Sequence, residues 1–122
     1  MSGLKPLRIA AAFRQRFDAN FRLQDRIAEY EGLLIALLSR GYEFLTVRDV
    51  AQHLQQGKPL PPRRVTLRHD IDTDPEYADR WLMVESRHGI RASYYFRLRT
   101  LDISAMKRIE RAGGEASYHF EE

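Results

Sequence analysis

The chain contains no cysteine, and this absence excludes two kinds of structure at once. Without thiols, neither a disulfide framework nor a zinc–thiolate centre can form. A long apolar run is missing as well, because the longest one, residues 33–38, is far too short to span a bilayer. A metal site would therefore have to use histidine and carboxylate ligands, and no membrane span is expected.

A secretory signal and a strong charge of one sign are also lacking. Residues 1–20 mix apolar residues with arginines and hold no uninterrupted apolar core, so a cytoplasmic location is expected by default. The net charge of +3 over 122 residues does not indicate a nucleic-acid partner, because a solvated arginine-rich surface explains it. The hydrophobic content of 43% is ordinary for one small folded domain.

The N-terminal part of the chain carries a helical pattern. Between residues 21 and 40 the apolar side chains recur at steps of three and four, and Gly41 follows as a stop signal. This spacing predicts one amphipathic helix. Residues 1–41 are therefore expected to form a helical N-terminal extension.

From residue 42 onward, strand and helix patterns alternate. Short branched or aromatic runs predict strands over residues 42–45, 65–69, 90–98 and 115–120. Helical periodicity and capping residues predict helices over residues 47–56, 75–88 and from Ile103 to the glycine pair at 113–114. This alternation favours parallel βαβ units, and thus an α/β fold, over an all-α or all-β fold.

The densest cluster of chemical groups follows the second predicted strand. An imidazole and three carboxylates stand within six positions: His69, Asp70, Asp72 and Asp74. Like charges so close together are unfavourable unless a partner offsets them, and a bound divalent cation would do so. The plainer interpretation is that Asp74 caps the next helix and that Asp70 or Asp72 accepts backbone N–H bonds in the turn.

A second histidine, His119, ends the last predicted strand. The carboxyl ends of parallel strands meet at one edge of a sheet, so Asp70, Asp72 and His119 are expected to converge there. Carboxylate and imidazole ligands suit zinc, and also manganese, cobalt or nickel. A lone histidine at a strand end is, however, more often a hydrogen-bonded structural residue than a ligand.

Three sequence blocks resemble a known family. They are VTLRHDID at residues 65–72, GIRASYYF at residues 89–96 and GGEASYH at residues 113–119. In order and spacing they are similar to the first motif, the following strand and the start of the second motif of the polysaccharide deacetylase (NodB-homology) family. The first block is similar to the branch of that family in which this motif reads Arg-His-Asp-Val-Asp.

The resemblance implies a fold and an activity. The family fold is an irregular (β/α)7 barrel, and residues 42–122 would be its N-terminal portion. The implied activity is metal-dependent removal of an acetyl group from an N-acetylated sugar of a surface polysaccharide or its precursor. By their place in the motifs, Asp70 would be the general base, and Asp72 and His119 would hold the metal. The metal is expected to be zinc, with manganese, cobalt or nickel as alternatives.

Two departures from the family pattern bear on these expectations. The usual first motif has two adjacent aspartates, whereas Ile71 separates Asp70 from Asp72 here, so their roles follow from order alone. The second motif usually ends in another histidine, which would fall at position 123. We therefore expect these 122 residues by themselves to lack turnover, to bind metal weakly and to self-associate through the sheet edge near residues 116–120.

Two other functions fit parts of the sequence. A catalytically inactive barrel that binds a glycan or a protein partner is compatible with the split first motif. A helix-turn-helix DNA-binding unit, formed by residues 46–57 and the helix before them, is disfavoured. A strand is predicted between its two helices, and a basic recognition face is lacking.

Overall fold

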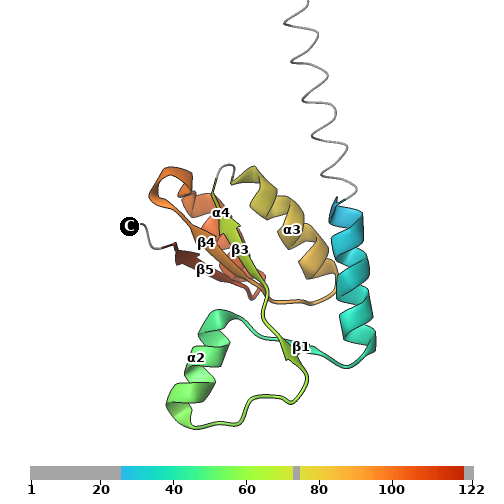
Figure 1. Cartoon of the computed structure of the whole chain (residues 1–122). Coiled ribbons are helices and arrows are strands. Elements are labelled where there is room, and N and C mark those ends of the chain that lie inside the picture. Colours follow the sequence, from blue (N-terminus) through green and yellow to red (C-terminus); the bar gives the residue numbers. More distant parts are fainter. Residues whose placement is uncertain (1–25, 73–74, 120–122) are drawn as a thin grey trace, which may run out of the picture.

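The computed structural model describes residues 26–72 and 75–119, which form a small α/β domain (Figure 1). A helix over residues 26–39 comes first. The elements that follow are β1 (Glu43–Phe44), α2 (Val47–Gln56), β2 (Arg64–Val65), β3 (Arg68–Ile71), α3 (Glu76–Arg87), β4 (Ser93–Phe96), the 3-10 turn η1 (Leu98–Thr100), α4 (Ile103–Arg111) and β5 (Glu115–Tyr118).

The strands form two separate parallel sheets. β1 pairs with β2, and a three-stranded sheet has the order β3-β4-β5. The prediction of a single strand over residues 65–69 was therefore wrong, because this stretch is divided between β2 and β3. The partner of this stretch changes along its length. The Val65 carbonyl accepts from the Leu45 N–H, which follows β1, whereas the Leu67 carbonyl accepts from the Ser93 N–H of β4.

Other predicted boundaries shift by a few residues. α2 begins and ends as predicted, between the N-cap Thr46 and Gly57, which takes the left-handed conformation at φ 65°. The strand predicted over residues 90–98 shortens to β4, because the Ile90 N–H bonds back to the Glu85 carbonyl of α3 and Leu98 already belongs to η1. The capping role predicted for Asp74 lies outside the described residues.

In the described part of the chain, the helices are too short or too polar to cross a membrane.

Helices cover one face of the three-stranded sheet. α3 and α4 pack on this face around a core of seven buried residues: Ile71, Ala78, Ala92, Tyr94, Phe96, Ala105 and Ile109. On the outer side of α3, Leu34 of the 26–39 helix packs with Val84 and Ile90 (Figure 1). The described part of the predicted N-terminal extension therefore contributes to the core of the domain.

The opposite face of the same sheet is polar. In parallel strands, residues in register and residues two apart point to the same side. Two such rows line this face: Arg68, Ser93 and Glu115, then Asp70, Tyr95 and Ser117. Parallel sheets normally bury apolar side chains on both faces. This face therefore differs from the apolar faces usual in parallel sheets, and its polar groups need partners of their own.

Glu115, the first residue of β5, connects the first turn of α2 to this polar face through hydrogen bonds. Its buried carboxylate accepts bonds from the Arg48 N–H at 2.9 Å, the Ser93 hydroxyl at 2.9 Å and the Ser117 hydroxyl at 2.6 Å. Burial alone would raise the pKa of the Glu115 carboxyl, but these donors hold it below its ordinary value of 4.5. The charged form is therefore the one that stabilises the fold.

Lowering the pH should remove the stabilisation that the ionised Glu115 carboxylate gives to the folded protein. Because the pKa of Glu115 is lower in the folded than in the unfolded protein, its contribution is complete above pH 4.5 and is lost as the pH falls through the folded pKa. We expect Glu115→Gln to lower the free energy of unfolding at neutral pH by about 1–3 kcal/mol and to flatten its decline below pH 4.5. Urea unfolding between pH 3 and 7 measures both effects. The exposed Glu43→Gln should leave the curve unchanged, and an unaltered acid slope in Glu115→Gln would contradict the assignment.

Candidate active site

Two of the predicted site residues meet at the carboxyl edge of the three-stranded sheet. Asp70 is the third residue of β3, and His119 directly follows β5. The His119 Nε2 and Asp70 Oδ2 atoms lie 3.5 Å apart. The structure therefore brings together a carboxylate and an imidazole that are 49 positions apart in the sequence.

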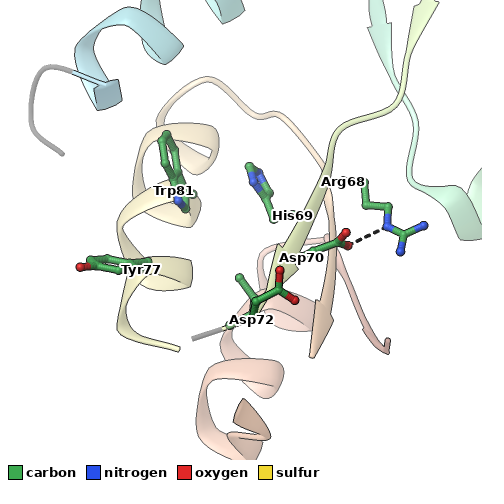
Figure 2. Close-up of a pocket in the computed structure, with 7 residues that line it drawn as sticks. Arg68, His69, Asp70, Asp72, Tyr77 and Trp81 are labelled. Carbon is green, nitrogen blue, oxygen red and sulfur yellow. Dashed lines mark hydrogen bonds and ion pairs between the residues drawn. The ribbon is translucent and has the colours of Figure 1, made fainter. Parts of the chain in front are cut away.

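The other oxygen of Asp70 is held by Arg68. The Arg68 Nε donates to Asp70 Oδ1 at 2.7 Å (Figure 2), and the guanidinium lies over the Tyr95 ring, 4.4 Å from its centroid. This cation–π contact keeps Arg68 on the polar face. Asp70 is consequently fixed from two sides, with Oδ1 toward an arginine and Oδ2 toward His119.

Asp72 bonds an arginine. It follows β3 directly, and its Oδ1 accepts from the Nε of Arg97 at 2.7 Å. Arg97 follows β4 directly, so both partners stand at the same edge of the sheet. Of the three predicted site residues, the structure thus pairs Asp70 with His119 and places Asp72 against a protein cation.

A pocket of about 280 Å³ opens beside these groups, near the lower end of the usual size of small-molecule sites, about 300 Å³. Its lining comes from β3 and its end (Arg68, His69, Asp70, Ile71 and Asp72) and from α3 (Tyr77 and Trp81). In Figure 2, His69 and Asp70 point to opposite sides of β3, with His69 directed toward α3. Aromatic rings beside carboxylates suit a ligand that has both apolar surface and polar groups.

Sequence reasoning missed Glu85, a buried carboxylate that contacts the His69 ring of the pocket wall. It is 0% exposed. One carboxylate oxygen accepts from the Tyr30 hydroxyl at 2.5 Å and faces the His69 Nε2 at 2.6 Å, and the other accepts from the Tyr94 hydroxyl. The signal in the sequence was a glutamate four positions after Trp81, on the apolar side of α3.

The network around Glu85 fixes the donor state of both tyrosines. Burial, reinforced by the charge of Glu85, raises the pKa of the Tyr30 and Tyr94 hydroxyls far above its usual range. Both hydroxyls therefore remain protonated donors. The His69 ring stacks on Trp81, with centroids 5.8 Å apart and planes at 16°. The wall of the pocket opposite Asp70 is thus held by a closed set of hydrogen bonds and ring contacts.

The donor set can be compared with what a metal requires. Two ligands of a tetrahedral zinc, each at about 2.0–2.2 Å from the ion, lie about 3.4 Å from one another. The Asp70–His119 separation of 3.5 Å is compatible with that value. At Asp72 the guanidinium of Arg97 already stands where a cation would bind. In residues 26–72 and 75–119, no three acidic or histidine side chains are arranged to hold an ion together. The donor types thus suit a metal, but only Asp70 and His119 are spaced as two ligands of one ion, and Asp72 is turned to Arg97.

Comparison with known protein families, curated proteins and solved structures gives no match. Membership of the polysaccharide deacetylase family consequently stays a prediction that rests on the three sequence blocks.

Proposed function

We propose that the chain carries part of the active site of a metal-dependent sugar N-deacetylase. The observation that carries the proposal is the approach of His119 to Asp70 at the carboxyl edge of a parallel sheet, on a face that is polar rather than apolar. Active sites of α/β folds collect at this edge. The adjoining pocket offers aromatic and carboxylate walls, which suit a sugar that bears an acetamido group.

The roles follow from the order of the residues in the motifs, and the contacts of Asp70 support its part. Arg68 orients the Asp70 carboxylate, and the Asp70 Oδ2 remains directed to the site, where it would take a proton from the attacking water as general base. By their order in the motifs, Asp72 and His119 would hold the metal, although it is Asp70 that approaches His119 and Asp72 bonds Arg97. The metal would supply a polarised acetyl carbonyl and a water of lowered pKa. Trp81 and Tyr77 would bound the sugar on the α3 side of the pocket.

A second function is favoured by one observation. Both carboxylates at the sheet edge are already neutralised by arginines, Asp70 by Arg68 and Asp72 by Arg97. Such pairs are what a deacetylase-like fold without turnover would retain if it bound a glycan or a protein partner. The two functions differ in one measurable property, which is whether the site binds a divalent metal.

Metal titration tests the proposal. We expect the purified chain to bind zinc, manganese, cobalt or nickel at one site, and His119→Ala to weaken that binding at least tenfold, because it removes the imidazole donor. Isothermal titration at neutral pH measures the affinity. His53→Ala, on α2, provides the matched control, since it removes a histidine elsewhere in the fold.

The outcome separates the two functions. Equal metal affinity in the wild-type chain and in His119→Ala would show that any binding occurs elsewhere, and would favour the non-catalytic fold. Loss of binding in His119→Ala would favour the deacetylase, and acetate release from N-acetylglucosamine oligosaccharides that chelator stops is expected of a protein that also carries the later motifs of the family.

A further inference from the structure

We propose that the outer edge of β5 is a surface through which two copies of this chain pair, and that the Glu110 carboxylate holds this edge closed. The sequence predicted a sheet edge open to another chain near residues 116–120. The structure places a carboxylate in front of that edge at Ala116. The role of this edge does not depend on a bound metal, so it stands apart from the proposed function.

The backbone groups that β5 turns outward can be identified from its bonds to β4. β5 is the outer strand of the three-stranded sheet in the described part of the chain (Figure 1). The Glu115 and His119 N–H groups donate to carbonyls of β4. Because successive residues of a strand direct their N–H groups to opposite sides, those of Ala116 and Tyr118 point away from β4. An edge of this kind is a template for pairing with another strand.

Glu110, on α4, closes the first of these two positions. Its Oε1 accepts from the Ala116 N–H at 3.1 Å, so it stands where the carbonyl oxygen of an added strand would have to stand. Arg48 holds the carboxylate there with two bonds, of 2.9 Å and 3.2 Å. The bonds from Arg48 keep the pKa of the Glu110 carboxyl below its ordinary value of 4.5, so it is charged at neutral pH. Charged side chains at sheet edges are one means by which proteins prevent strand addition.

A hollow of about 330 Å³ lies beside this edge, between α4 and β5. Its lining comes from one side of α4 and one residue of β5: Ile103, Met106, Lys107, Glu110, Arg111 and Ala116. Ala116 and Tyr118 lie on the helix side of the sheet, because they are in register with the buried Tyr94 and Phe96. A strand added to β5 would therefore place every second side chain over the hollow.

A second copy of β5 fits this surface. When two β5 strands are set antiparallel about a twofold axis at Ser117, Ala116 of one copy lies opposite Tyr118 of the other. Both residues turn their N–H and C=O groups outward, so each such pair can exchange two hydrogen bonds. The small Ala116 leaves room for the half-exposed Tyr118 ring, which then covers the hollow beside α4. The contact is isologous, since the same patch serves both copies.

Pairing in this register requires Glu110 to withdraw from both copies. The Glu110 carboxylate and the carbonyl of the second copy compete for one N–H group, that of Ala116. Side-chain exposures of 45% for Arg48 and 42% for Glu110 give this ion pair room to move aside. The charged pair therefore weakens self-association without abolishing it.

Removing the carboxylate should strengthen self-association. We expect Glu110→Ala to tighten the dimer by at least about tenfold, because the Ala116 N–H of each copy no longer has to give up a charged acceptor. Glu110→Gln keeps an acceptor oxygen but loses the charge, so its effect should be smaller. Sedimentation equilibrium at neutral pH measures the dissociation constant. Asp79→Ala is the matched control, since Asp79 also bonds an arginine at a similar exposure, 43%, and it should leave association unchanged.

Cross-linking through a single cysteine tests the register. At the twofold axis the two Ser117 Cα atoms would lie about 4.5 Å apart, within the disulfide range of about 4.4–6.8 Å. The chain has no cysteine of its own. Glu110→Ala combined with Ser117→Cys should therefore form a disulfide-linked dimer under mild oxidation, and Ser117→Cys alone should form much less. Glu110→Ala combined with Ser86→Cys, at an exposed position on α3, should stay monomeric on a denaturing gel.

A proline at the edge separates strand pairing from other contacts. Ala116→Pro removes the outward N–H and leaves the bonds to β4 in place. In the Glu110→Ala background it should return self-association to the wild-type level. Circular dichroism shows whether each variant is folded, and Glu110→Gln carries the test if Glu110→Ala is not.

The results decide both parts of the proposal. If Glu110→Ala and Glu110→Gln associate no more tightly than Asp79→Ala, the role of Glu110 is refuted. Tighter association that survives Ala116→Pro, or that gives no cross-link at position 117, refutes the pairing of β5 with β5. Tighter association that Ala116→Pro reverses and that cross-links at position 117 supports both.

Discussion

Replacing Glu85 by alanine is expected to lower the free energy of unfolding by about 3–5 kcal/mol, because several buried or partly buried groups lose their hydrogen-bond acceptor at about 1–3 kcal/mol each. The carboxylate is 0% exposed and accepts from the hydroxyls of Tyr30 and Tyr94, besides facing the His69 ring. Without it, two buried hydroxyls and an imidazole nitrogen lose their acceptor, and each unsatisfied group adds its own desolvation penalty. A domain of this size is typically stable by about 5–15 kcal/mol, so the loss is a large part of the total.

Urea unfolding followed by circular dichroism measures this effect. Glu85→Gln keeps the shape and one acceptor oxygen, so its cost should be smaller, about 1–3 kcal/mol. Ser86→Ala, at the exposed neighbouring position on α3, is the control and should change stability by less than about 0.5 kcal/mol. Tyr30→Phe in the Glu85→Ala background should restore part of the loss, because it removes one unsatisfied hydroxyl. A cost for Glu85→Ala no greater than that of Ser86→Ala would contradict the role of the network.

The second large effect is expected on turnover. In a protein that combines these residues with the later motifs of the family, Asp70→Asn should reduce acetate release by about 10²–10⁴-fold, the usual contribution of a general base. The amide cannot take the proton from the water, whereas its oxygen can still accept from Arg68. Metal affinity should therefore change little.

Asp72→Asn provides the matched comparison, because it alters the neighbouring carboxylate by the same chemical change. It should weaken metal binding by at least about tenfold, since an amide is a poorer ligand than a carboxylate. Acetate release at saturating metal and isothermal titration separate the two effects. If instead Asp70→Asn loses the metal and Asp72→Asn loses only turnover, the two roles are exchanged. The 3.5 Å approach of His119 to Asp70 makes that comparison necessary.

Local signals were sufficient to predict several elements. α2 matches its predicted range, because Thr46 and Gly57 supply both caps within the segment itself. Asp102 caps α4 as predicted, with its carboxylate accepting from the Ala105 N–H. In β4, Tyr94 and Phe96 are buried and Tyr95 is turned to the other face, which is the side-chain alternation of any strand. These features depend on neighbours only a few positions away.

Long-range features were missed. The division of residues 65–69 between β2 and β3 depends on where β1 ends and where β4 offers a new partner, which local strand patterns do not contain. The role of Glu85 requires donors from positions 30, 69 and 94. The pairing of Asp72 with Arg97 depends on a turn that follows a different strand.

The sequence by itself determined which kinds of side chain could hold a metal: without cysteine, the ligands must be histidines or carboxylates, and the three sequence blocks pointed to Asp70, Asp72 and His119 at predicted strand ends. Only the tertiary structure decided how they are paired. Each carboxylate has several cations and donors within reach in principle, and Coulomb energy depends on distance, which strand order and register set. Because β3 and β5 flank β4, His119 at the end of β5 lies near Asp70 on β3. Arg97, which follows β4, lies beside Asp72, which follows β3.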